Sequence, residues 1–135
     1  MKLPKLMLLG LGLLVSAQVM AGADHYVRKD GSHVQHLKIS KQKGDVNVLV
    51  DVDFDPSGSE TDKPCSAEIA GEAKVISDTE LKLKKQAQGE AHYCELTITL
   101  GADDAKIEES QDCARYFSGG FCRFGSEGKS LKKIQ

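Results

Sequence analysis

Four cysteines, Cys65, Cys94, Cys113 and Cys122, carry the most distinctive chemistry of this chain. Cysteines in an exported chain pair as disulfides, whereas clustered thiolates bind zinc. Their successive spacings are 29, 19 and 9 residues, which leaves no C-x₂-C unit of the kind that zinc sites use. The sequence therefore predicts two disulfides. Of the three connectivities we expect Cys65–Cys94 and Cys113–Cys122, because each then closes a local segment and contributes roughly 2–4 kcal/mol.

The stretch before the last cysteine is the second chemical feature. It reads DCARYFSGGFC and holds three of the seven aromatic residues of the chain. Arginine and tyrosine are enriched at interface hot spots, glycines allow close backbone approach, and a bridge across the stretch preorganises it. We therefore expect it to bind a partner through five residues: Arg115, Tyr116, Ser118, Gly119 and Gly120. In the alternative, its rings fill a core that lacks tryptophan, and we favour a mixture in which some rings are buried and others presented.

Nucleophilic catalysis is not expected. Ser118 lies between Phe117 and Gly119 as if on a sharp turn, but the G-x-S-x-G pattern of a nucleophile elbow is missing. Oxidised cysteines do not act as nucleophiles. Carboxylates are plentiful enough for glycosidase chemistry, yet the few aromatic residues offer a poor sugar-binding cleft. The sequence predicts no enzyme and no catalytic residue.

Asp51, Asp53 and Asp55 resemble the start of a calcium-binding loop. Pro56 stands where such a loop needs glycine, and no glutamate follows at the twelfth position. We expect these carboxylates to line a solvated strand edge instead, and weak cation binding by them stays open.

The histidines are not expected to bind metal either. His33 and His36 are three residues apart, so on a strand their side chains point to opposite faces. A copper-binding amino terminus needs a histidine third in the mature chain, and the cleavage sites predicted below place His25 fourth or second. We therefore expect no metal ion and no cofactor.

The amino-terminal segment has the pattern of a bacterial secretory signal. Lys2 and Lys5 precede the apolar run 6–15, and small residues follow. Cleavage is expected after Ala21, so that residues 1–21 are the signal peptide, or after Ala23. The run has about half the length that a membrane-spanning helix needs. We expect export to the periplasm or secretion, without membrane insertion after cleavage.

The expected mature chain, residues 22–135, is long enough for one domain. It carries 16 Lys and Arg against 20 Asp and Glu, a net charge of −4. Nucleic-acid binding needs clustered cations, so no nucleic-acid partner is expected. A mildly acidic surface is compatible with a basic protein partner.

Alternation of apolar and polar residues with period two predicts most of the secondary structure. The segments that carry it are 34–39, 45–55, 65–76, 79–85 and 92–100, and residues 130–134 are expected to return to the sheet. Gly71 is expected to mark a bulge or bend. Short connections favour antiparallel hairpins, and no segment predicts a convincing amphipathic helix. We expect an all-β domain: a small antiparallel sandwich or partly closed barrel of six to eight strands, with two disulfides.

An exported β protein of this size with a Ser-Gly loop resembles the periplasmic lysozyme inhibitors of Gram-negative bacteria. In several of these families the serine and tyrosine of an S-G-x-x-Y motif enter the lysozyme cleft near its catalytic carboxylates. The corresponding stretch here is SGGFC. Ser118 matches the serine, and Cys122 takes the place of the tyrosine, whose role Tyr116 would have to supply. The resemblance implies a sandwich or barrel and a protein target.

Together these features predict a non-enzymatic periplasmic binding or inhibitor protein. Its expected partner is a secreted or periplasmic protein, most plausibly a basic cell-wall hydrolase, and a toxin-neutralising immunity protein fits the same description. One alternative is a structural or envelope-stress protein whose aromatic stretch is wholly internal. A second alternative is a small metal-binding protein or enzyme, which requires a pocket that gathers histidines or carboxylates from separate strands.

Overall fold

The predicted strands form, and two further strands accompany them. The computed structural model describes residues 23–55, 64–89, 91–117 and 122–135. The predicted signal peptide lies outside these ranges, and Ala23 is the first residue of the first strand. The elements, in chain order, are β1 Ala23–Asp30, β2 His33–Gln42, β3 Asp45–Phe54, β4 Cys65–Ser77, β5 Glu80–Gln86, β6 Tyr93–Leu100, β7 Asp104–Glu109, α2 Gln111–Tyr116 and β8 Leu131–Lys133.

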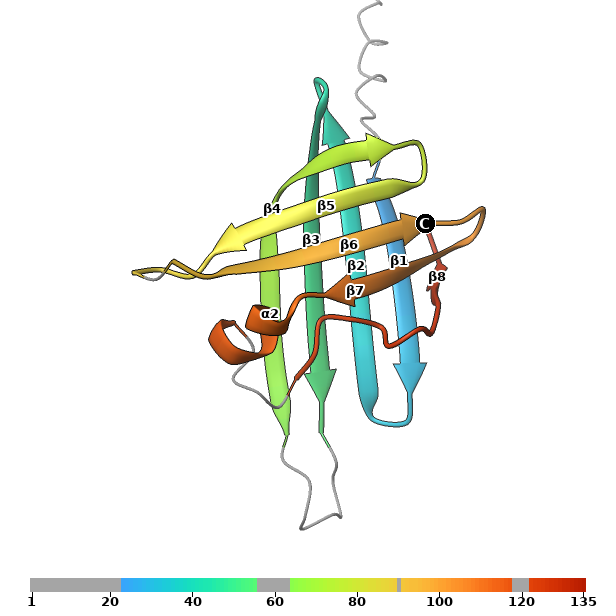
Figure 1. Cartoon of the computed structure of the whole chain (residues 1–135). Coiled ribbons are helices and arrows are strands. Elements are labelled where there is room, and N and C mark those ends of the chain that lie inside the picture. Colours follow the sequence, from blue (N-terminus) through green and yellow to red (C-terminus); the bar gives the residue numbers. More distant parts are fainter. Residues whose placement is uncertain (1–22, 56–63, 90, 118–121) are drawn as a thin grey trace, which may run out of the picture.

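The eight strands form a closed antiparallel barrel (Figure 1). Each strand pairs with the next along the chain, and the short β8 pairs with both β7 and β1, which closes the ring. In the view of Figure 1, β1 to β4 run side by side, whereas β5 to β7 cross them steeply. The prediction of an all-β antiparallel fold of up to eight strands with two disulfides is confirmed.

The longest strand, β4, joins the two groups of strands. Residues 65–73 of β4 pair with β3, and from Ala73 onward the strand pairs with β5. The pairing with β3 continues without interruption through Gly71, and the irregularity lies between Val75 and Ser77. A Cβ atom on Gly71 would lie 3.0 Å from Leu83 Cδ1. Of the bulge or bend expected at Gly71, the bulge is therefore excluded, and this glycine allows close packing inside the barrel.

The core is made of the alternate residues that face the barrel interior. The predicted inner face of β3 is confirmed, because Val46, Val48, Val50 and Val52 are buried. The largest fully buried side chains of the described ranges come from six strands and from the segment after α2, and they include Leu37, Leu83, Leu96, Ile98, Ile107, Phe124 and Leu131. No helix within these ranges has the length and apolarity to cross a bilayer.

The strands β1 and β7 were not expected from the sequence. In β1 the two buried inward positions are Tyr26 and Arg28, and a buried arginine hides the apolar alternation. The strand β7 has only six residues, of which Ala105 and Ile107 point inward. Both strands are stabilised by their neighbours in the barrel, which a local pattern does not reveal.

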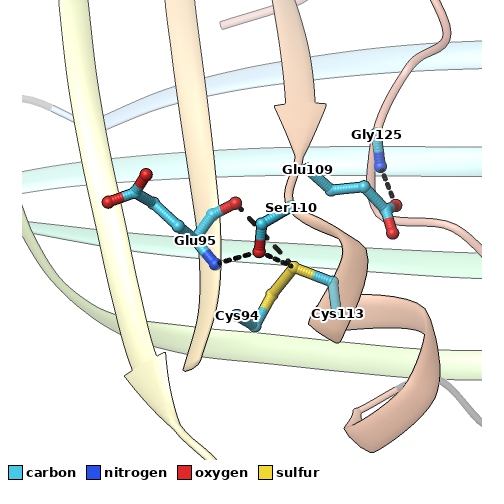
Figure 2. The surroundings of a disulfide bond; sticks show 6 residues. All are labelled: Cys94, Glu95, Glu109, Ser110, Cys113 and Gly125. Atoms are coloured by element: carbon cyan, nitrogen blue, oxygen red, sulfur yellow. Dashed lines mark hydrogen bonds between the residues drawn. A yellow bond between two sulfur atoms is a disulfide. The ribbon is translucent and has the colours of Figure 1, made fainter. Parts of the chain in front are cut away.

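Residues 122–130, which we call the closing segment, pack against the barrel between α2 and β8. The Phe124 side chain is completely buried, and its carbonyl oxygen accepts a hydrogen bond from Nε2 of the buried Gln35 on β2. The backbone N–H of Gly125 donates to Glu109 Oε1 over 2.7 Å (Figure 2). The closing segment is thus tied both to the interior and to the end of β7.

Candidate partner-binding site

Helix α2 is fixed to the first residues of β6 (Figure 2). Cys113, which is buried in the helix, forms a disulfide with Cys94, and their Cα atoms are 4.3 Å apart. Ser110 precedes the helix. Its backbone N–H donates to the Glu95 carbonyl oxygen over 3.0 Å, and its Oγ accepts from the Glu95 N–H over 2.9 Å. One covalent bond and two hydrogen bonds therefore position the start of α2.

The second disulfide joins Cys122 to Cys65, the first residue of β4, with Cα atoms 5.7 Å apart. The four cysteines are all paired, as expected, but the favoured connectivity of Cys65–Cys94 and Cys113–Cys122 is wrong. In the described structure the bridges link residues 19 and 57 positions apart.

Strand register explains the correction. In the β6–β7 hairpin Leu96 pairs with Glu109, so the same register carries Cys94 to the level of residue 111, and Cys113 follows in the first turns of α2. Cys94 pairs on its other side with Lys85 of β5, which brings it level with Gly71 of β4. Cys65 lies six residues before Gly71 in β4, which places it roughly 20 Å from the level of Cys94 at the usual strand rise.

The segment from Cys113 to Cys122 is consequently held at both ends, by bonds to two different strands. Within it Arg115 is exposed, and Tyr116 is half-buried at the end of α2. Phe117 packs against the core. The other three predicted partner-binding residues, Ser118, Gly119 and Gly120, lie outside the described residues. The described residues at the two ends of this segment are therefore anchored, by bonds that differ from those expected.

An aromatic stack lies on the exposed side of α2. The rings of Tyr116 and His92 are nearly parallel, with centroids 4.6 Å apart and an interplanar angle of 16°. His92 Nδ1 lies 3.3 Å from Asp112 Oδ2, and this histidine side chain is 45% exposed. The stack fixes the Tyr116 ring while leaving part of it accessible, and no local pattern in the sequence predicts that His92 contacts this helix.

Next to His92 in the chain, Tyr93 adds a second accessible aromatic residue. Its side chain is 42% exposed, and the Lys84 Nζ lies 4.6 Å from the centre of its ring. A lysine over a tyrosine ring is a favourable cation–π arrangement. The start of β6 and the end of α2 therefore both present ordered aromatic side chains to solvent.

Asp51 and Asp53 of β3, and Asp55 directly after it, do not line a sheet edge. Strand β3 pairs with β2 on one side and β4 on the other, so the predicted edge role is wrong. Asp51 lies between His36 of β2 and Glu68 of β4 on the outer face, and Asp53 and Asp55 are exposed. In the described ranges no group of three or more histidine, cysteine, aspartate or glutamate side chains is arranged to hold a metal ion.

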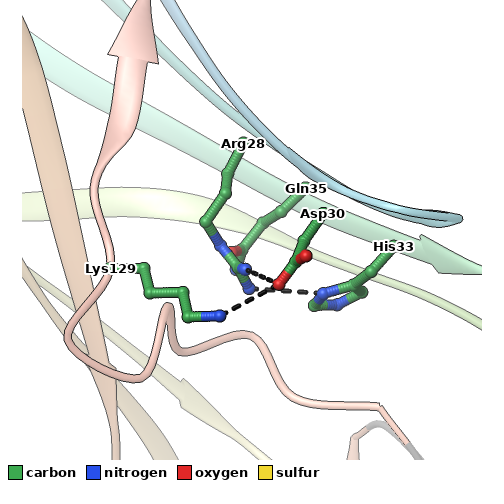
Figure 3. A network of polar contacts seen from close by, with 5 residues as sticks. All are labelled: Arg28, Asp30, His33, Gln35 and Lys129. Carbon is green, nitrogen blue, oxygen red and sulfur yellow. Dashed lines mark hydrogen bonds and ion pairs between the residues drawn. The ribbon is translucent and has the colours of Figure 1, made fainter.

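A polar network fills one end of the barrel (Figure 3). The buried Arg28 donates through Nε to Gln35 Oε1 at 3.3 Å, and its Nη2 lies 3.3 Å from His33 Nδ1. Asp30 Oδ2 accepts from Lys129 Nζ at 2.9 Å and lies 3.8 Å from Arg28 Nη1. The sequence does not reveal this network, because Arg28 looks like an ordinary surface cation until the barrel buries it.

A pocket of about 370 Å³ opens beside this network and beside the Cys65–Cys122 bridge. Its lining includes Asp30, His33, Phe54, Arg123 and Glu127. It thus gathers one histidine and two carboxylates from separate parts of the fold, as the metal-binding or enzymatic alternative requires.

The Asp30 carboxylate of this pocket is already paired with Lys129 and Arg28. The hydrogen bond and charge of Lys129 lower the pKa of the Asp30 carboxyl, which makes it a weak base. Burial, followed by the charge of Arg28, lowers the pKa of His33, whose Nδ1 contacts the guanidinium. The two cysteines in the lining are joined in a disulfide. The described lining therefore supplies no activated nucleophile.

The lowered pKa of His33 predicts a pH-dependent stability. Glu127 and Asp30 partly oppose the effects of burial, Arg28 and Lys129, and the net shift favours the neutral ring in the folded state. The stabilising contribution is complete above the ordinary value of 6.5 and is lost as the pH falls through the lowered pKa, because the unfolded state binds more protons there. Denaturant unfolding between about pH 7.5 and pH 5 should show a smaller loss for His33→Gln than for the parent chain, and parallel profiles would contradict this.

No protein-family model matches the chain, and no curated protein or solved structure matches it either.

Proposed function

We propose that this protein is a non-catalytic inhibitor of a secreted cell-wall hydrolase and acts in the periplasm or outside the cell. The observation that carries the proposal is the anchoring of the segment between Cys113 and Cys122, whose ends are bonded to β6 and β4. Anchors at both ends reduce the conformational freedom that a segment can lose on binding, so more of its contact energy appears as affinity. Two disulfides also suit an oxidising compartment.

The accessible residues of this region have the chemistry of a protein interface. Arg115 is exposed on α2, and Tyr116 and Tyr93 present ordered rings. Arginine and tyrosine dominate interface hot spots because they combine a large contact area with directional hydrogen bonds. Tyr116 is partly accessible, whereas the purely structural alternative requires it to be fully buried.

Surface charge supports a basic partner. Five carboxylates lie on the outer face of β3 and β4, and within the described ranges none of them forms an ion pair. They are Asp45, Asp51, Asp53, Glu68 and Glu72. Asp51 and Glu68 even lie directly opposite each other, an arrangement that destabilises an isolated sheet. A negative face of this kind accelerates association with a positively charged protein.

The test is inhibition of purified lysozymes. The oxidised protein should slow peptidoglycan hydrolysis by at least one enzyme among the chicken-type, goose-type and invertebrate-type classes, with one-to-one stoichiometry. The double variant Arg115→Ala/Tyr116→Ala should bind that enzyme about 100-fold more weakly, because it removes two hot-spot side chains. Both residues are accessible, so the variant should retain the circular dichroism spectrum of the parent.

Lys41→Ala provides the matched control. Lys41 is exposed at the end of β2, in the part of the barrel that lies away from α2 in Figure 1. This variant should inhibit as well as the parent chain. Absence of inhibition across all three classes would refute the hydrolase target, and equal inhibition by the double variant would refute the site.

A further inference from the structure

Two histidines meet on the outer face of the barrel, away from the aromatic stack of α2. His25 of β1 and His36 of β2 are diagonal neighbours, since Lys38 pairs with His25 and Val27 pairs with His36. Both side chains are half-buried. The His25 Nε2 and His36 Nδ1 atoms are 2.8 Å apart, and the ring centroids are 5.1 Å apart.

Carboxylates continue this row across the barrel. Asp51 pairs with His36, and Glu68 pairs with Asp51. The row His25, His36, Asp51, Glu68 thus crosses four neighbouring strands on one face. Neither carboxylate forms an ion pair within the described ranges. Their negative charge attracts a cation and is opposed at His25 by the charge of Lys38, its partner on β2.

We propose that His25 and His36 together bind a divalent late transition-metal ion, with Cu(II) preferred. Imidazole nitrogen is a ligand that suits copper, nickel and zinc, and copper binds most tightly in this series. The remaining coordination positions belong to water, and Asp51 adds negative charge beside the ion. This site is independent of the proposed inhibitor surface.

The two nitrogens are already about as far apart as two adjacent ligands of a square-planar ion. Two nitrogens 2.8 Å apart, each at a metal–nitrogen distance of about 2.0 Å, subtend an angle of roughly 90° at the ion. That is the angle between adjacent ligands of a square-planar or tetragonal ion, the geometry typical of Cu(II) and Ni(II). A tetrahedral zinc ion would require the nitrogens to separate to about 3.3 Å.

Binding needs the rearrangement of one hydrogen atom and a rotation of both rings, because nitrogens 2.8 Å apart between ring centroids 5.1 Å apart face each other directly. In the hydrogen-bonded pair one ring donates its N–H to the lone pair of the other. When the ion enters, the donating ring carries its hydrogen on its other nitrogen, so both facing nitrogens offer lone pairs. Each imidazole stays neutral, and no oxidant or reductant takes part.

The test is a titration of the oxidised protein, purified without a histidine tag, with Cu(II) and separately with Zn(II). We expect one Cu(II) ion per chain, a weaker affinity for zinc, and an electron paramagnetic resonance spectrum with two coordinated imidazole nitrogens. His25→Gln and His36→Gln should each weaken copper binding by about tenfold or more, since even residues that only orient a ligand contribute that much. Unchanged circular dichroism spectra show that each variant is folded.

His33→Gln is the matched control, because His33 lies inside the polar network and glutamine can still accept a hydrogen bond from Arg28. It should bind copper like the parent. Loss of binding in His25→Gln but not in His36→Gln would place the ion at the amino terminus and overturn the proposal. Absence of one-to-one copper binding by the parent chain, or tighter binding of zinc than copper, would also overturn it.

Discussion

Replacing Cys65 and Cys122 together by alanine is expected to lower the free energy of unfolding by about 4 kcal/mol. The bridge closes a loop of 57 residues, and the entropy that such a loop removes from the unfolded chain grows with its length. A single domain has only about 5–15 kcal/mol of stability, so the variant loses a large part of it. Urea unfolding followed by circular dichroism measures the difference.

The second bridge gives the comparison for this prediction. Cys94 and Cys113 are 19 positions apart, and their joint replacement by alanine should lower the free energy of unfolding by about 3 kcal/mol. A change below about 1 kcal/mol for the Cys65–Cys122 variant, at the low end of what disulfides contribute, would mean that this bridge does not constrain the unfolded chain as supposed.

The Phe124→Ala substitution is expected to lower the free energy of unfolding by about 3–5 kcal/mol. Phe124 heads the set of fully buried side chains in the described ranges, and its backbone carbonyl receives the Gln35 hydrogen bond. Removing the ring leaves a cavity where the closing segment meets the barrel interior, and the Cys65–Cys122 bridge two residues away limits how far the structure can relax into it. Thermal and urea unfolding of the variant report the loss.

Phe124→Leu is the control for packing. Leucine keeps most of the buried apolar surface, so this variant should lose clearly less stability than Phe124→Ala. Equal losses in the two variants would show that the aromatic shape, rather than the buried volume, determines the stability of this end of the barrel.

Local residue patterns predict most of the fold, because the side chains of a half-buried strand alternate between the core and solvent. The run from Asp45 to Phe54 illustrates this, since its valines occupy the predicted inner face. Alternation of apolar and polar residues does not reveal a strand whose buried side chains are polar or whose length is short. In β1 the buried Arg28 interrupts the apolar alternation, and in β7 only Ala105 and Ile107 point inward. Such strands exist because their neighbours complete their hydrogen bonds.

The candidate site was accessible only in part. The types and spacing of Arg115 and Tyr116 pointed to the segment, but not to its anchoring, since disulfide partners depend on strand register. The same reason hid the pair of His25 and His36, which are eleven residues apart in the chain and in contact across two strands. Register is a property of the whole barrel, whereas residue spacing describes a single strand.

The proposed inhibitor surface depends on the connection of Cys113 and Cys122 to two different strands, and tryptic mapping of the unreduced protein tests this connection directly. Cleavage after Lys74, Lys106, Arg115 and Arg123 separates all four cysteines into different peptides. We predict that mass spectrometry will find peptide 86–106 linked to peptide 107–115, and the peptide ending at Lys74 linked to peptide 116–123. A link between peptides 107–115 and 116–123 would contradict the account, because the segment would then be closed on itself rather than anchored to the barrel.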